Sequence, residues 1–533
     1  MAEEKMNVLY TVDGQVYPST GYRDALEKLK ELSKEYTELK GKKENRNQKN
    51  NEEGKVQPSR VYAKGHDLFV KKCLMPFPKK GEKKTVFIKW LDMSTLVDGG
   101  NVEDEIHLTV MTPEMLLTDY LFYTYAANWI DQRDDITRIW NEELDNFYKP
   151  YYYAFDQYGI KNIDRSLLNT LKEKDGSEYK WFRATICLAN EDERNVTVTE
   201  NMLRGNLCFS ASQYEIRDIF MKDIEEVEDE ELREQIKKVD YIPDINKING
   251  CVVDVTKTNI LNALNGSFDA DSYISIYNVG QANCLYIYLK DKGYQQRIFF
   301  DVGRPYDKVN GVRNIDLDKK GISASLSNIS FCCPHMVILS HWHRDHVLAS
   351  QTLGMAAYDK KAGCEWIAPV PDEKGKKCYR RLINYLILRE MIKFVDQSKV
   401  PLSGVIANTG KITLYQGQGK GDLNKSGLIL RLYNTLLAGD CTYQYWPVSL
   451  INDIDKIENL IVPHHGGGID VNDVTELNKR TKYKRGRAVI CVGENEYGHP
   501  LQKHIIKLAE TFKIVEKTSS WNSGIFKDTM LIV

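Results

Sequence analysis

The segment SHWHRDH at residues 340–346 follows directly after the apolar run MVIL. Three of the ten histidines in the chain, with one aspartate, therefore fall within six residues. The apolar run predicts a short buried strand. His341 and His343 are two residues apart, so in an extended segment both side chains project from one face. Asp345 and His346 follow where the chain turns toward a predicted helix. Two imidazoles and a carboxylate–imidazole pair at one strand end can hold two metal ions side by side.

Composition narrows the class of protein. A length of 533 residues predicts two or three domains. The net charge of −2 gives no overall basic field of the kind that attracts nucleic acid, although a local basic patch could still bind it. The 11 cysteines are scattered and form no CxxC pair, which favours a reducing, cytoplasmic location. The sequence opens without an apolar signal region and has no long apolar run, so we expect no membrane span.

Changes in texture along the chain predict three parts. Residues 1–58 are interpreted as an N-terminal helix, at 23–40, followed by a polar linker. Residues 59–267 are expected to form an α+β domain of unknown role, with strands at 86–90 and 106–110. The acidic segment 223–234 is expected to be an exposed helix.

Residues 268–533 are expected to form the third part, in which strands and helices alternate. Period-2 patterns predict strands at 273–277, 285–289 and 297–300. Segments 427–432 and 435–438 are expected to form a hairpin, and 382–395 a helix.

Five short motifs surround the histidine segment in a fixed order. They are VGQAN at 279–283, FFDVG at 299–303, LLAGD at 436–440, VPHHGG at 462–467 and YGHP at 497–500. This order resembles the metallo-β-lactamase superfamily and, more closely, its ComEC-type branch, whose domains carry VGQG, DxG, a histidine–aspartate motif, LLxGD, PHHG and GHP. The resemblance covers about 270–533. It implies an α/β fold, an αββα sandwich with metals at one edge, preceded by the separate α+β domain.

The resemblance also implies roles for individual residues. His341 and His343 would hold one ion, and Asp345 and His346 the other. Asp440 would bridge both ions, and one histidine of the PHHG motif would complete the second site. The full set of implied metal ligands is His341, His343, Asp345, His346, Asp440, and His464 or His465. The implied catalytic residues are Asp345, Asp440 and His499, the last as a ligand or as a donor to the substrate oxyanion. Asp301 and Asn283 would support the ligands from behind.

Two departures from the branch concern this site. The superfamily usually supplies a further histidine to the first ion, but residues 347–439 contain none. The first site is therefore open, borrows a ligand from the His464–His465 pair, or is weakly occupied. In the turn before the second strand, Asn283 stands where the branch has an aspartate.

Several functions remain open at this point. The first hypothesis is a hydrolase that uses a hydroxide held by two divalent ions, zinc or manganese, to cleave phosphodiester bonds of DNA or RNA. A second is hydrolysis of another bond: a cyclic nucleotide, a small phosphoester, a lactone or thioester, or a peptide, because the fold alone does not choose. A third is a partner-gated component of a prokaryotic defence assembly. The N-terminal half would then serve a protein partner or a homo-oligomer.

Overall fold

The computed structural model describes residues 8–12, 15–19, 81–112, 157–160, 181–188, 203–209, 215–228, 251–253, 272–303, 334–350, 364–468, 484–520 and 531–532, apart from a few positions within these ranges, and some single residues between 228 and 251. The helix expected at 23–40 and the linker expected at 41–58 lie outside them. The chain divides into two compact units, Met1–Pro243 and Asp244–Val533. Among the described helices, none is long and apolar enough to cross a membrane.

The first unit contains a small hairpin and an antiparallel sheet. The hairpin joins β1 (Val8–Val12) to β2 (Gln15–Ser19). The sheet has the strand order β5-β4-β3-β6-β8-β7. Its strands are β3 (Lys83–Asp98), β4 (Asn101–Met111), β5 (Gln157–Ile160), β6 (Trp181–Leu188), β7 (Leu203–Phe209) and β8 (Glu215–Glu226). The strands expected at 86–90 and 106–110 lie within β3 and β4.

The helix expected at 223–234 is wrong over its first four residues, which belong to β8. Charge density suggested an exposed helix, but β8 pairs with β6 and buries Phe220, Met221 and Ile224. Glu225 forms a 2.9 Å ion pair with Arg183 across that pairing. Cross-strand contacts and burial therefore outweigh the local charge pattern.

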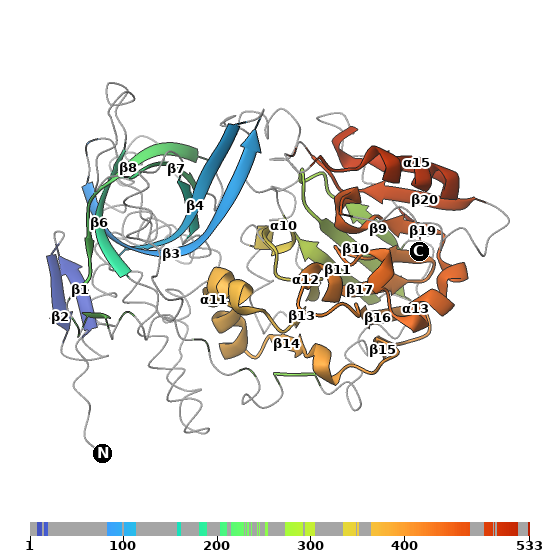
Figure 1. Ribbon diagram of the computed structural model, residues 1–533. Helices are drawn as coiled ribbons and strands as arrows, with labels where there is room; N and C mark the ends of the chain where they lie inside the picture. The colour runs from blue at the N-terminus through green and yellow to red at the C-terminus, as the bar shows by residue number, and fades with distance from the viewer. Residues whose placement is uncertain are drawn as a thin grey trace, which may run out of the picture. The chain divides into compact units, whose positions relative to one another are not determined.

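The second unit contains two seven-stranded sheets (Figure 1). The first has the order β14-β13-β12-β11-β10-β9-β22 and the second β15-β16-β17-β18-β19-β20-β21. The first sheet comprises β9 (Tyr273–Ile276), β10 (Cys284–Asp291), β11 (Tyr294–Val302), β12 (Met336–Ile338), β13 (Glu365–Pro369), β14 (Ile392–Val395) and β22 (Leu531–Ile532). The second comprises β15 (Val405–Asn408), β16 (Ile412–Gln416), β17 (Leu428–Leu432), β18 (Thr435–Leu437), β19 (Asn459–Ile461), β20 (Arg485–Ile490) and β21 (Phe512–Lys517).

Two apolar layers show how the sheets pack. One core joins side chains of both sheets, such as Leu285 and Phe300 of the first with Leu430 and Val489 of the second. A further core covers the outer face of the second sheet, where Leu450 of α13 (Val448–Asn452) and Leu508 of α15 (Gln502–Thr511) pack. In the first sheet, α11 (Glu373–Leu388) connects the parallel strands β13 and β14. This layered α/β arrangement confirms the predicted fold class.

The strands and the hairpin expected in this half are found, but the helix expected at 382–395 is only half right. The helix α11 ends at Leu388, and Ile392–Val395 form the edge strand β14. Glu390, between them, has a φ of 51°, which reverses the chain. Apolar residues on both sides of this turn continue the helical pattern by coincidence, so periodicity alone could not locate the break.

Strand direction brings distant motifs to one edge of each sheet. Strands β11 and β12 run parallel, and so do β18, β19 and β20. The carboxyl ends of parallel strands meet at the same edge, so the loops after them are neighbours. FFDVG and SHWHRDH occupy these positions in the first sheet, and LLAGD, VPHHGG and YGHP in the second.

Candidate metal centre

Two groups of side chains at this edge could each hold a metal ion. One comprises Asp345, His346, Asp440 and His465, and the other His341, His343 and Asp440. Within each group the possible ligand atoms all lie within 4.8 Å of one another. Asp440 belongs to both groups, as expected of the bridging carboxylate that the resemblance implied.

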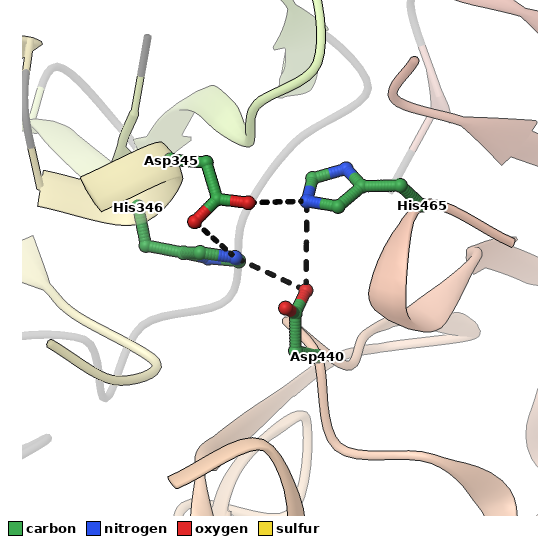
Figure 2. Close-up of side chains that lie close together, drawn as sticks. All are labelled: Asp345, His346, Asp440 and His465. Atoms are coloured by element: carbon green, nitrogen blue, oxygen red, sulfur yellow. Dashed lines mark hydrogen bonds and ion pairs between the residues drawn. The ribbon is translucent and has the colours of Figure 1, made fainter. Parts of the chain in front are cut away.

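Figure 2 shows the four-residue group, with its side chains pointing toward one another. Asp345 and His346 come from the short helix α10 (Arg344–Val347), while Asp440 follows β18 and His465 lies in the 3-10 turn η12 (Pro463–Gly466). The Nε2 atom of His346 lies 3.0 Å from Oδ1 of Asp440, and Nε2 of His465 lies 3.1 Å from Oδ2 of Asp345. Each of these pairs joins the first sheet to the second.

Asp301 supports the histidines from behind. It lies near the end of β11, fully buried, with a φ of 57°. Its carboxylate accepts hydrogen bonds from Nδ1 of His346 at 2.7 Å and from the backbone N–H of Ser340 at 2.6 Å. Because its Nδ1 is engaged, His346 presents Nε2 to the metal group.

Ser340 is a residue that the sequence analysis missed. Its hydroxyl lies 2.8 Å from Oδ2 of Asp301 and 3.0 Å from Nδ1 of His341. The hydroxyl can therefore accept from the His341 N–H while donating to the carboxylate, which leaves Nε2 of His341 facing the metal group. The only signal in the sequence was its place between the apolar strand and the first histidine.

The PHHG turn separates its two histidines. Both have positive φ, 50° for His464 and 52° for His465, and their rings make different contacts. His465 donates from Nδ1 to the carbonyl of Cys491 at 2.6 Å and joins the four-residue group. His464 belongs to neither group, and its ring packs edge-on against His499 with the centroids 5.3 Å apart.

His499 lies beside the centre without joining it. Asn495 holds its backbone through two hydrogen bonds, of 3.0 and 2.8 Å. Its ring covers Gly467 so closely that a Cβ there would overlap it. Burial and the neighbouring His464 and His465 lower the pKa of His499 to about 4, so its imidazole is neutral near pH 7.

Asn283 reaches the centre through its backbone. Its N–H donates to the carbonyl of Asp345 at 2.9 Å, and its carbonyl accepts from Gly303 at 2.7 Å. The side chain is buried, and both amide atoms lack a hydrogen-bond partner among the described residues. The contact therefore ties the VGQAN turn to the histidine segment 340–346. Of the remaining histidines, His335 bonds to Arg297, His504 lies under the PHHG turn, His107 is in β4, and His66 lies outside the described residues.

Electrostatics divide the centre into charged and neutral donors. Burial would raise the pKa of Asp440, but His346 and His465 hold it well below its usual range. Burial would likewise lower the pKa of His346, but Asp440, Asp301 and Asp345 raise it well above the usual value. Burial and the neighbouring His346 and His343 lower the pKa of His341 far enough to keep it neutral. The raised pKa values of His346 and His465 favour protonated imidazoles beside Asp440 and Asp345, and a bound cation would displace those protons.

The donor set fits divalent metal ions. Nε2 of His341 is buried and has no hydrogen-bond partner among the described residues, while the buried Nε2 of His346 and Oδ1 of Asp440 pair only with each other, at 3.0 Å, without an aligned hydrogen bond. Buried polar atoms are normally satisfied, so these incompletely satisfied donors close together indicate a cation site. Imidazole and carboxylate together suit zinc and manganese. The identity and the number of the ions stay predictions.

Comparisons with known proteins add little to this picture. No family model matches the sequence, and no curated protein does. Among solved structures, one match is a diphosphatase of the PhnP family, with 9% identity and a TM-score of 0.29. The alignment spans 48% of this chain and 96% of the diphosphatase chain. A similarity this distant carries no argument about what this chain acts on.

Proposed function

We propose that this chain is a metal-dependent hydrolase that cleaves phosphodiester bonds in DNA or RNA. The observation that carries the proposal is the convergence of histidines and aspartates from separate segments on two donor groups with one shared carboxylate. Two divalent ions held this way can clamp the attacking and leaving oxygens of an in-line displacement at phosphorus. The order of motifs, which resembles the ComEC-type branch, supports nucleic acid as the substrate.

Three side chains are assigned direct parts in this reaction. Asp440 spans both donor groups and fixes their separation. The side chain of Asp345 is 28% exposed, while Asp440 is nearly fully buried, so Asp345 lies on the solvent side from which a substrate enters. His499 is half-buried and neutral, and we assign its N–H the role of hydrogen-bond donor to a substrate oxygen. A neutral imidazole stabilises developing charge without first needing a proton.

A substrate panel tests the proposal. The full chain, supplied with Mn²⁺ or Zn²⁺, would be incubated with labelled single- and double-stranded DNA, RNA, cyclic nucleotides, and small phosphoester, lactone, thioester and peptide substrates. We expect cleavage of a nucleic acid, loss of that cleavage in Asp440→Ala, and a decrease of about a hundredfold or more in His499→Ala. Asp422→Ala serves as a matched control, because this carboxylate caps the surface helix α12 (Leu423–Ser426).

The outcomes separate the candidate functions. Cleavage of a cyclic nucleotide, ester or peptide alone would replace the nucleic-acid assignment with the second hypothesis. Cleavage that persists at full rate in Asp440→Ala would show that another site, or a contaminant, does the chemistry. A chain that binds no metal and cleaves nothing would contradict the proposal as a whole.

A further inference from the structure

The two donor groups differ in the number and charge of their donors. The group around His346 has four protein donors, two of which are the carboxylates Asp345 and Asp440. The group around His341 has three donors, and its only carboxylate is the shared Asp440. A divalent cation is therefore attracted more strongly to the four-donor group, by one additional negative charge and one additional bond.

No described histidine completes the smaller group. Residues 347–439 contain none, and His465 is already in the four-donor group. His464 is close enough to His341 to lower the pKa of His341, but it belongs to neither group and its ring packs against His499. The smaller group thus keeps one coordination position without a protein ligand among the described residues.

The donors also differ in how firmly they are held. Both histidines of the four-donor group are fixed through Nδ1, His346 by Asp301 at 2.7 Å and His465 by the Cys491 carbonyl at 2.6 Å. In the smaller group, His341 is linked to Asp301 through the Ser340 hydroxyl, which lies 3.0 Å from Nδ1 of His341. Pre-oriented ligands lose less freedom on binding, so this difference also favours the four-donor group.

We propose that the two ions bind with unequal affinity and have different roles. The four-donor group holds a tightly bound, resident ion. The group of His341, His343 and Asp440 would hold a weaker, exchangeable ion, and its smaller number of protein donors would leave room for a substrate oxygen. Zinc sites with four protein ligands are typically structural, whereas sites with three ligands and an open position are typically catalytic. This inference rests on the proposed function and adds to it an assignment of the two sites.

Metal titration of three matched variants tests the inference. The full chain would be freed of metal with a chelator and titrated with Co²⁺, followed by calorimetry and by the visible spectrum, which reports coordination number. The variants are His343→Asn, His465→Asn and His464→Asn. Asparagine tolerates the left-handed backbone of residues 464 and 465, so the last two differ only in which histidine is lost.

We expect two binding steps in the unaltered chain, with dissociation constants that differ by more than about tenfold. His343→Asn should lose the weak step and keep the tight one, whereas His465→Asn should weaken the tight step by more than about tenfold. His464→Asn should keep both steps. Asp345→Asn repeats the test of the tight site without altering the PHHG turn.

Two results would overturn the inference. Two equal steps in the unaltered chain would do so, and so would loss of the tight step in His343→Asn. Neither result would remove the proposed hydrolase function, because two ions would still bind. Absence of any Co²⁺ binding would instead contradict the proposed function itself, so the two failures are distinguishable.

Discussion

At the scale of single residues, one buried carboxylate orients two ligands. Asp301 accepts directly from His346 and, through the hydroxyl of Ser340, fixes His341. Replacing Ser340 with alanine removes the link to His341 and the 3.1 Å contact with Nδ1 of His346, but leaves the 2.7 Å bond between His346 and Asp301. We therefore expect Ser340→Ala to weaken metal binding by about 10- to 100-fold, mainly in the group of His341. Competition of the purified variant with a chromophoric chelator measures this change.

A buried serine elsewhere provides the control. Ser272, at the opposite end of the first sheet, accepts a 3.0 Å hydrogen bond from the N–H of Lys290. Its replacement by alanine should cost about 1 kcal/mol in the free energy of unfolding and leave metal affinity unchanged. If both variants weakened metal binding equally, the effect would be one of general stability, and the orienting role of Ser340 would be wrong.

The residue scale also shows where prediction from the sequence succeeds and where it stops. Histidines and aspartates are uncommon enough in this pattern that their spacing alone indicated a metal centre. Ser340 is a common residue type, and its role depends on Asp301, 39 positions earlier in the chain. The choice between His464 and His465 depends on two positive φ angles in the turn, which sequence spacing does not reveal.

At the scale of elements, the position of the metal ligands depends on how closely the end of β11 approaches the histidine segment 340–346. Gly303 follows β11, and a Cβ there would overlap the backbone carbonyl of Asp345. Gly303→Ala should therefore displace α10 or the end of β11. We expect a loss of about 1–3 kcal/mol in the free energy of unfolding, together with weaker metal binding, because Asp345 and His346 both lie on α10.

Gly421 offers the matched substitution for this test. A Cβ at this position would have no atom within 4 Å, but the residue has a φ of 70°, so Gly421→Ala tests backbone strain alone. That variant should lose about 1 kcal/mol and bind metal normally. Chemical denaturation and metal titration of both variants measure the difference. Normal metal binding in Gly303→Ala would contradict the close-approach argument.

Elements were predicted well where one signal dominated. Alternation located the strands that became β9, β10 and β11, and the hairpin of β17 and β18. Prediction was wrong where a turn interrupted a continuous apolar pattern, between α11 and β14, and where tertiary pairing outweighed charge, in β8. Both errors arise because apolar periodicity and charge density are local patterns, and neither carries information about the strand that will lie alongside.

At the scale of the second unit, the metal donors connect the two sheets of the sandwich. His341, His343, Asp345 and His346 follow the first sheet, whereas Asp440 and His465 follow the second. Without metal, the sheets are joined at this edge by the His346–Asp440 and His465–Asp345 pairs. A bound ion would replace those pairs with stronger bonds in the folded state, and unfolding would separate its ligands.

Metal should therefore stabilise the folded chain by an amount that grows as the free ion concentration rises above its dissociation constant. At a free ion concentration of about 100 times the dissociation constant, the gain is about 2.7 kcal/mol. For a unit of this size, that gain corresponds to an increase in Tm of about 5 °C. We expect a chelator to lower the Tm of the protein as purified, Zn²⁺ or Mn²⁺ to restore it, and Asp440→Asn to abolish the difference. Calorimetric scans with and without the ion measure it. A Tm that stays the same with the chelator and with added metal would show that the two sheets are not joined by a cation at this edge.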